Sequence, residues 1–460
     1  MAKSTTTAPS TTARARVRTK SKRLLSAVAM GAVSAVTASV AAAGGAAFAA
    51  PDYPSWNDVE KAKQNESTKQ AEIATLGELL NGLASQAAKA VTTAQIAAEA
   101  YRVTQDALDA ATLRETSLSE QAATAEATAA TSKMRAGLIA AHLAKSGASG
   151  LSLNLFLNGN SADDLLSQLG TASKLSEQSE QIYTEAVQDK NAAESLGEQA
   201  ASATEERERL TEESKTTFDV ATASSTAAEA AYNTQQRKSS ELFEQLALLK
   251  DTTAEAERSF HAGEDAAAAA SAFAQAQASA AAIADAAAAQ AVRDTAAAAG
   301  SGSGSGAGSG SGSGSGSVAP SVPATPSPPV ALPNASIVDT ALAFANAQLG
   351  DRYVFGGSGP DAWDCSGLTK AAYAAAGVYI GTHSATNQYN TMASQGKLVS
   401  FAQVQVGDLV FWGSPGNYYH VAIYAGNGQV LEAPNPSSRV RVHSIWSSWA
   451  VAPYVGRPAA

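Results

Sequence analysis

The chain has 460 residues, more than one hydrophobic core usually organises, and a formal net charge of −10 at pH 7. Hydrophobic residues make up 45% of it but aromatic residues only 6%, which suits long helices with narrow apolar seams better than one large core. The charge is uneven, because residues 24–317 carry a net −17 while residues 318–460 are neutral. This strongly acidic segment argues against nucleic acid as a partner.

Residues 1–49 have the pattern of a secretory signal peptide. Residues 1–23 contain seven Lys and Arg and no acidic residue, an apolar stretch begins at Leu24, and Ala47-Phe48-Ala49 forms a small-x-small cleavage site. The alternative is an uncleaved membrane anchor, since the apolar stretch is long enough to span a bilayer. With either, we expect the rest of the chain to be secreted, extracellular or associated with the cell wall.

Residues 50–299 predict a coiled-coil helical hairpin with an alanine-rich helical tail. The first arm runs from Trp56 to about Ala144, and its apolar and small residues recur in alternating steps of three and four, which is the seam of a coiled coil. The seam residues are Ile73, Leu76, Leu80, Leu83, Ala87, Ala90, Ala94, Ala97, Tyr101, Thr104, Leu108 and Ala111. The sequence leaves open whether the coiled coil is an intramolecular hairpin or a dimer.

The expected tip of the hairpin, at about residues 146–161, begins with two glycines, at positions 147 and 150, that end the first helix. It holds the apolar run Leu151–Leu157, which either folds back as a local staple or serves as a docking knob for a partner. A second helical run follows to about residue 260, and residues 263–299 are nearly pure alanine, helix-prone but with little to pack.

A linker separates the helical part from the C-terminal domain. Residues 300–317 are a Gly/Ser repeat, expected to span about 23 Å as a coil, and residues 318–334 are proline-rich. The linker therefore covers residues 300–335, and residues 336–460 form a last domain of ordinary size for one core.

The single cysteine of the chain, Cys365, lies where a nucleophile is useful. Asp364 can cap a helix that ends before Gly377, which places the thiol in the first helical turn. The positive end of the helix dipole favours the thiolate there. The plainer interpretation is a small buried hydrophobic residue.

The thiol needs a base, and His420 is the candidate. Residues 406–412 and 420–434 have the alternation of strands, and Gly426-Asn427-Gly428 marks a turn between two of them. A three-residue loop at these residues places Ala422 opposite Glu432, so that His420 and Glu432 share one face within hydrogen-bonding reach. A two-residue Asn-Gly loop would place them on opposite faces.

Four motifs resemble those of NlpC-type cell-wall endopeptidases. They are Tyr353-Val-Phe-Gly-Gly357, Asp364-Cys-Ser-Gly-Leu368, Gly407-Asp-Leu-Val-Phe-Trp412 and His420-Val-Ala-Ile-Tyr424. The resemblance covers about residues 336–456 and implies a papain-like α+β domain, in which a helix-borne cysteine packs on a small antiparallel sheet. The whole layout resembles Gram-positive hydrolases that separate daughter cells. The sequence departs from the family pattern at Phe355, Val406 and Ala422.

The resemblance also implies roles for individual residues. Cys365 matches the nucleophile, His420 the base and Glu432 the residue that orients the imidazole. Three further residues match positions that line the substrate cleft: Tyr353, Asp364 and Ser366. His383, in the segment GTHSATNQY, is a candidate for the rim of the cleft. One cysteine and scattered histidines offer no spacing of metal ligands, so we expect neither a metal nor another cofactor.

The function that this implies is a D,L-endopeptidase acting on peptidoglycan stem peptides, between D-γ-glutamate and the diamino acid, in cell separation or wall remodelling. In relatives such hairpins respond to an FtsEX-type membrane division complex, for which the tip is the expected contact. Two alternatives remain: an N-acetylmuramoyl-L-alanine amidase that uses the same Cys-His pair, and a non-catalytic wall-binding scaffold.

Overall fold

The structure is a computed structural model that describes residues 53–147, 162–300 and 330–460. The expected signal peptide, the hairpin tip and most of the linker lie outside these residues. None of the helices in the described part of the chain is long and apolar enough to cross a membrane.

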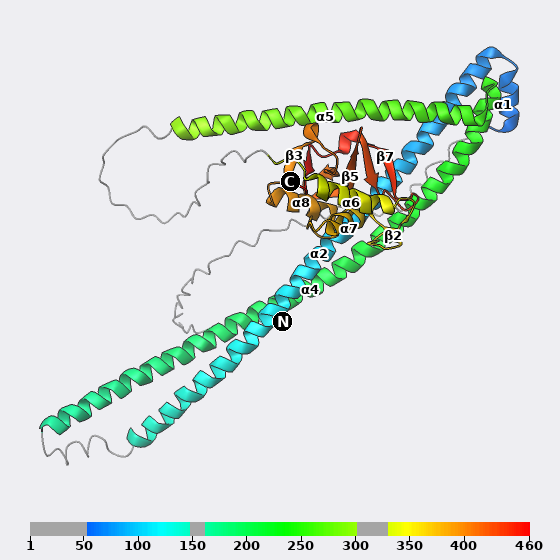
Figure 1. Cartoon of the computed structure of the whole chain (residues 1–460). Helices are drawn as coiled ribbons and strands as arrows, with labels where there is room; N and C mark the ends of the chain where they lie inside the picture. Colours follow the sequence, from blue (N-terminus) through cyan, green and yellow to red (C-terminus); the bar gives the residue numbers. More distant parts are fainter. Residues whose placement is uncertain (1–52, 148–161, 301–329) are drawn as a thin grey trace, which may run out of the picture. The chain divides into compact units, whose positions relative to one another are not determined.

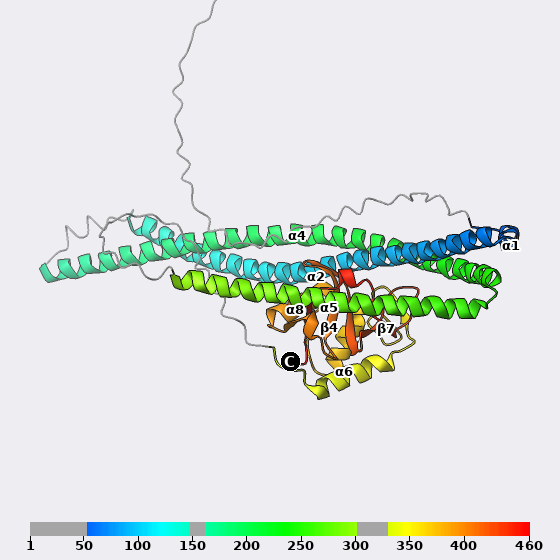
Figure 2. The same cartoon turned by 90° about the horizontal axis from the view of Figure 1, so that it is seen from above.

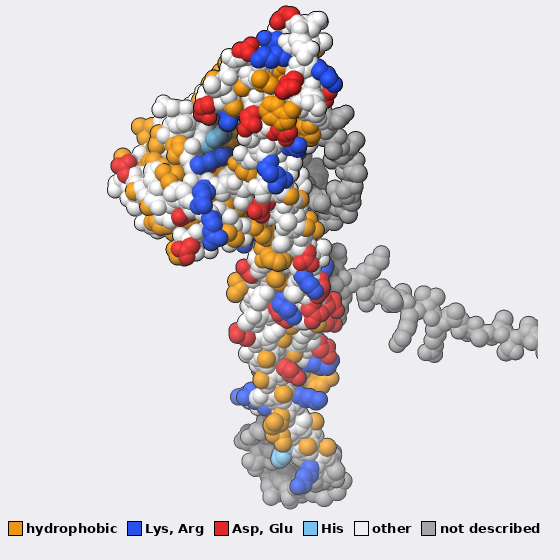
Figure 3. Space-filling view, turned by 90° about the vertical axis from the view of Figure 1, so that its right-hand side faces the viewer, with side chains coloured by type: hydrophobic (Ala, Val, Ile, Leu, Met, Phe, Trp, Pro, Cys, Tyr) orange, Lys and Arg blue, Asp and Glu red, His pale blue; other side chains and the backbone are white. Residues whose placement is uncertain are grey.

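The helical part forms an antiparallel hairpin within one chain. Helix α1 (Trp56–Lys63) precedes the long helix α2 (Glu66–Gly147), which packs along α4 (Ala162–Lys250). At one end of the pair, leucines of both helices are buried in a shared cluster: Leu76, Leu80, Leu83, Leu242, Leu246 and Leu249. Farther along, the guanidinium Nε of Arg207 lies 2.6 Å from the carboxylate of Glu115. Intrachain packing thus buries three of the four leucines and several alanines of the predicted seam. Figure 3 shows acidic and basic side chains intermixed along the surface of the helical part.

The alanine-rich tail is a third long helix, α5 (Ala254–Gly300), and it does have something to pack against. The expectation of little packing is wrong, because α5 runs along the C-terminal domain (Figures 1 and 2). The Phe273 ring stacks on Tyr424 at 6.2 Å and meets Phe401 edge-on at 5.5 Å. Ala280 is buried, and its carbonyl oxygen accepts a hydrogen bond from Ser400. Small side chains let the helix approach the sheet closely.

The C-terminal domain is the expected α+β fold with a small antiparallel sheet. Its helices are α6 (Ala335–Ala347), α7 (Cys365–Ala375) and α8 (Ala385–Ser394). A short parallel pair joins β1 (Arg352–Tyr353) to β2 (Ala362–Trp363). The main sheet has the order β3-β8-β4-β5-β6-β7, made of β3 (Leu398–Ser400), β4 (Leu409–Ser414), β5 (Asn417–Gly426), β6 (Gln429–Glu432), β7 (Arg441–Ser444) and β8 (Tyr454–Gly456). Helices α6, α7 and α8 contribute to the core on one face of this sheet, and α5 packs on the other.

The turn between β5 and β6 differs from the expectation, yet the register does not. The loop is the two-residue Asn427-Gly428, both with positive φ as a type I′ turn requires, and Gly426 pairs with Gln429. A bulge between Tyr424 and Gly426 then shifts one strand by a residue. The bulge restores the register that a three-residue loop would have given, so His420 and Glu432 still share a face.

The Gly407-Asp408 motif has a structural role. Gly407 has a φ of +93°, and a Cβ there would meet Val338 of α6. The buried carboxylate of Asp408 accepts two hydrogen bonds from Arg457, at 3.0 and 2.9 Å, and so ties the start of β4 to the end of the chain.

Candidate active site

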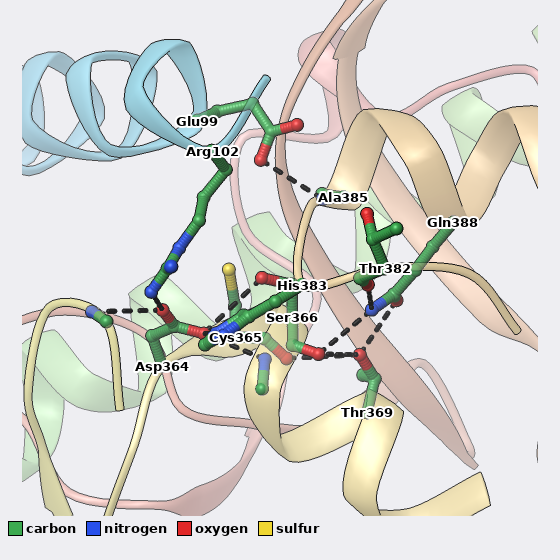
Figure 4. Close-up of polar contacts among 12 residues, drawn as sticks. Glu99, Arg102, Asp364, Cys365, Ser366, Thr369, Thr382, His383, Ala385 and Gln388 are labelled. Atoms are coloured by element: carbon green, nitrogen blue, oxygen red, sulfur yellow. Dashed lines mark hydrogen bonds and ion pairs between the residues drawn. The ribbon is translucent and has the colours of Figure 1, made fainter. Parts of the chain in front are cut away.

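Cys365 is the first residue of α7, as the sequence predicts. Asp364 precedes it in an extended conformation and accepts a hydrogen bond from the Gly367 amide at 2.8 Å, which caps the helix. A side chain at Gly367 would collide with the carbonyl oxygen of Gly357 and with His383, so only glycine allows the loop and α7 to approach this closely. In Figure 4 the Cys365 sulfur points from the start of α7 toward α2.

Glu432 lies beside His420 on the neighbouring strand, and the expected hydrogen bond is present. The distance from His420 Nε2 to Glu432 Oε2 is 3.0 Å, and both side chains are buried. Glu432 also accepts hydrogen bonds from Arg441 and from the Trp446 indole. Burial alone would raise the pKa of Glu432, but the hydrogen bonds and charges of these partners outweigh it and lower that pKa. Glu432 is therefore ionised at neutral pH.

The orientation of the His420 ring is fixed on both sides. Its centroid lies 5.1 Å from the Trp412 ring and 5.4 Å from the Trp446 ring. Because the Glu432 carboxylate only accepts, Nε2 carries the proton, and in the neutral ring Nδ1 keeps its lone pair. This is the tautomer that a general base needs, because the lone pair on Nδ1 can take a proton.

The thiol lies beside Val421, the residue that follows His420, and the surroundings of the thiol oppose its ionisation. The backbone amides of Val421, which follows His420, and of Ser366 hydrogen-bond the Cys365 sulfur. Burial, followed by the negative charges of Asp364 and Glu99, nevertheless raises the pKa of Cys365 far above its usual value. The amide of Ser366 at the helix start lowers that pKa, but burial and the two carboxylates outweigh it.

Other residues expected in the cleft gather around Asp364. His383 Nε2 lies 2.6 Å from one carboxylate oxygen of Asp364, and the Ser366 hydroxyl lies 3.4 Å from the same oxygen. Tyr353 is buried nearby, and burial, then the charges of Cys365 and Asp364, raises the pKa of its phenol. Burial would also raise the pKa of Asp364, but the hydrogen bond and charge of His383 and the charge of Arg102 lower it.

Gln388, which the sequence did not single out, holds the two helices of the site together. Its amide donates to the carbonyl oxygens of Ser366 and Thr382, and its carbonyl oxygen accepts from the Thr369 hydroxyl. Gln388 thus fixes the first turn of α7 against α8 and the loop before it. Nothing in the local sequence distinguishes it from an ordinary polar helix residue.

Four polar residues of α2, which the sequence did not single out, face the C-terminal domain, and Figure 4 shows two of them, Glu99 and Arg102. They follow one face of the helix in steps of four, three and four: Gln95, Glu99, Arg102 and Asp106. Each makes a polar contact with the C-terminal domain.

One of these contacts reaches an expected catalytic group, and another reaches a residue expected to line the substrate cleft. The Gln95 amide nitrogen lies 3.3 Å from His420 Nδ1, the nitrogen expected to act as the base, and donates to the Pro434 carbonyl oxygen at 2.7 Å. An Arg102 nitrogen lies 3.3 Å from the second carboxylate oxygen of Asp364. Helix α2 therefore covers the thiol–imidazole pair.

Aromatic contacts reinforce the cover. Phe355, where the sequence departs from the family pattern, lies 5.5 Å from Tyr101 of α2 and 6.0 Å from Phe218 of α4, measured between ring centroids. Phe355 therefore provides a contact for the hairpin.

A helix-borne thiol, an imidazole on an adjacent strand and a carboxylate that orients it define the class of papain-like thiol hydrolases. Residues 350–456 match the NlpC/P60 family. The C-terminal domain is therefore an NlpC/P60 domain.

The chain is similar to several peptidoglycan hydrolases. Peptidoglycan endopeptidase RipA of Mycolicibacterium smegmatis is 38% identical over 112 residues, 24% of this chain and 21% of RipA. RipB of Mycobacterium tuberculosis is 35% identical over 153 residues, 30% of this chain and 61% of RipB. The solved NlpC/p60 domain of the peptidoglycan hydrolase SagA is 39% identical, covering 26% of this chain and 97% of that domain, with a TM-score of 0.23. The chain spans less than two thirds of the curated relatives it matches first.

Proposed function

We propose that the chain is a secreted peptidoglycan hydrolase, a D,L-endopeptidase that cuts stem peptides between D-γ-glutamate and the diamino acid. The observation that carries the proposal is the joint placement of Cys365, His420 and Glu432 within an NlpC/P60 domain. Relatives named as peptidoglycan endopeptidases support the same substrate class.

In the proposed reaction, His420 Nδ1 takes the proton of the Cys365 thiol, and the sulfur attacks the γ-glutamyl carbonyl carbon. Backbone amides at the start of α7 stabilise the negative charge on the carbonyl oxygen. The imidazolium, held by the ionised Glu432, then gives its proton to the leaving amine as the C–N bond breaks. A water molecule, deprotonated by His420, attacks the thioester and releases the glutamyl product and the thiol.

We further propose that the covered form is latent. Gln95 contacts the nitrogen that must accept the thiol proton, and the surroundings of Cys365 keep that proton on sulfur. Substrate and α2 would occupy the same space, so hydrolysis requires that the helix leave the cleft.

The hairpin also carries our proposal for a partner, an FtsEX-type membrane division complex that docks at the tip around Leu153–Leu157. These residues lie outside the described part of the chain. The proposal fails if a Leu155→Ser, Phe156→Ser double variant keeps partner binding in a pull-down with the purified complex.

Digestion of purified peptidoglycan, followed by mass analysis of the fragments, tests the proposed reaction. We expect the chain with Glu99 and Arg102 both replaced by alanine to release fragments that begin at the diamino acid. Adding Cys365→Ala should abolish their release, because no other thiol is present. Fragments that begin at L-alanine would instead show an amidase. Wall binding without cleavage would favour the scaffold.

A further inference from the structure

Two tryptophans follow β7 three residues apart, and their surroundings differ. Trp449 is 85% exposed. The Trp446 indole instead donates a hydrogen bond to Glu432 Oε2 at 3.0 Å. The same oxygen lies 3.0 Å from His420 Nε2. One carboxylate oxygen of Glu432 thus accepts from the imidazole and from the indole together.

The Trp446 indole is fixed in this position by its neighbours. Its ring stacks on the Trp412 ring, with centroids 5.2 Å apart and planes 15° from parallel. The Trp412 indole, which is fully buried in the sheet, donates to the backbone carbonyl oxygen of Trp446 at 2.7 Å. The preceding residue, Ile445, is buried, and its amide donates to the Gly428 carbonyl oxygen at 2.9 Å. The indole N–H therefore has little freedom to turn away from Glu432.

The direction of the Glu432 carboxylate depends on what each of its oxygens accepts. Oε1 accepts from Arg441 at 3.2 and 3.1 Å, and the Arg441 side chain is 37% exposed. Oε2 accepts from His420 and Trp446. Without the indole donor, Arg441 becomes the strongest restraint on the carboxylate, which is then free to turn away from His420.

An indole suits this position because its N–H only donates. A water molecule at the same place both donates and accepts, so it would compete for the proton on His420 Nε2 and let that proton exchange. The side chains of His420 and Glu432 are buried, at 0% and 1% exposed, whereas Trp446 is partly exposed. Trp446 therefore has one side toward solvent and its N–H toward the carboxylate, and it keeps water from the hydrogen bond between Glu432 and His420.

We propose that Trp446 is a positioning residue of the hydrolytic site, whose indole holds the Glu432 carboxylate on His420 Nε2 and excludes water from that hydrogen bond. This rests on the proposed function for the reaction in which His420 acts. In that reaction Nε2 keeps its proton throughout, while Nδ1 takes the proton of the thiol and later gives it to the leaving amine. The imidazolium that forms in between is stabilised by Glu432 at Nε2, so a carboxylate that turns away slows the chemical step.

Proton NMR of the unsubstituted full chain tests this geometry without any substitution. The proton between His420 Nε2 and a buried carboxylate is expected far downfield, and its loss in His420→Gln assigns it. We expect a nuclear Overhauser effect between this proton and the indole N–H proton of Trp446, because both protons point to Glu432 Oε2. If both signals are assigned and no such effect connects them, the proposal is wrong.

Substitution of Trp446 then tests the exclusion of water. Trp446→Phe keeps an aromatic ring to stack on Trp412 and removes only the N–H donor and part of the ring. We expect the His420 Nε2 proton to exchange with water about 10-fold faster, as for loss of one hydrogen bond to a charged group. Trp449→Phe removes an exposed indole of the same segment and should leave the exchange rate unchanged. An unchanged rate in Trp446→Phe, or an equal increase in Trp449→Phe, overturns the proposal.

Kinetics connect this position to the reaction. In the chain with Glu99 and Arg102 replaced by alanine, Trp446→Phe should lower kcat about 10-fold and change KM less than about 2-fold, because the indole acts through Glu432 on the chemical step. A rise in KM with kcat unchanged would overturn the proposal, since it would show that Trp446 serves binding instead.

This proposal and the proposed function can fail separately, because the NMR signals need no peptidoglycan. If the Overhauser effect and the faster exchange are found but the chain cuts no peptidoglycan, Trp446 positions His420 and the hydrolase proposal fails. If peptidoglycan is cut and the exchange rate in Trp446→Phe is that of the unsubstituted chain, the hydrolase stands and the role of Trp446 fails.

Discussion

Replacing Glu99 and Arg102 together with alanine raises the rate of peptidoglycan hydrolysis by the full chain about 10- to 100-fold. Both side chains make charge-assisted contacts with the cleft, Glu99 with the start of α8 and Arg102 with Asp364. Truncating one member of a buried charged pair typically costs about 2–5 kcal/mol, because its partner stays buried without a counter-charge. Opening of the cleft returns that partner to water, so the substitution destabilises the covered form more than the open form. Because only the open form binds substrate, the rate rises with its population until the cleft is open throughout.

The rate is measured as release of new amino groups from purified peptidoglycan at equal protein concentration. A matched control is the pair Glu126→Ala and Arg135→Ala, which removes the same charges from exposed positions of the same helix. Circular dichroism shows whether α2 and α4 remain helical. A rate that is unchanged in the Glu99, Arg102 variant, or that rises as much in the control, contradicts the latent form.

A rise in pH should favour the open cleft, as the substitution of Glu99 and Arg102 does. Burial raises the pKa of Glu99 from 4.5 to about 7 in the covered form, although the hydrogen bonds from Ser384, Ala385 and Thr386 oppose this. The covered form therefore holds a proton that the open form releases, and covering is favoured at low pH and weakened as pH rises from about 4.5 through 7. The rate of the unsubstituted chain, divided by that of Glu99→Ala, should increase between about pH 5 and pH 8. A constant ratio would show that Glu99 does not titrate with opening.

The extent to which the sequence predicts this molecule depends on how local each feature is. Cys365 at a capped helix start and His420 beside Glu432 follow from short-range patterns. Even so, the bulge near Tyr424 shows that the correct register was reached through the wrong turn. The fold of the C-terminal domain can be predicted because its motifs keep the order and spacing that the sheet and its loops require.

Short-range patterns do not predict that α2 covers the cleft. Gln95, Glu99, Arg102 and Asp106 share one face of α2, but a polar face at helical spacing usually means contact with water. Their partners lie hundreds of residues away along the chain, as for Arg102 with Asp364 and Gln95 with Pro434. Only tertiary packing distinguishes a solvated face from one seated in a cleft. For the same reason, the alanines of α5 gave no sign of the sheet they pack against.

Glu432→Gln should lower kcat/KM about 10²- to 10⁴-fold, the range over which loss of the orienting carboxylate affects other catalytic triads. One carboxylate oxygen of Glu432 accepts from Arg441, and the other from His420 and Trp446. A glutamine has a single acceptor oxygen, so its NH₂ group must face a donor. If it faces Arg441, the guanidinium loses its acceptor. If it faces His420, the ring must move its proton to Nδ1, the nitrogen that has to accept the proton of Cys365.

This conflict has a specific remedy, which makes the prediction more than a test of structural damage. With Arg441→Ala added, the NH₂ of the introduced glutamine can turn toward the vacated, half-exposed space while its oxygen accepts from His420. We expect the kcat/KM of the double variant to lie within about 10-fold of that of Arg441→Ala alone. The deficit is modest because a neutral Asn orients the histidine in other papain-like enzymes. The kinetics are measured in the chain with Glu99 and Arg102 replaced by alanine. The contradicting result is a double variant whose kcat/KM is as low as that of Glu432→Gln alone. It would show that the charge of Glu432, and not the direction of the hydrogen bond, keeps His420 a base.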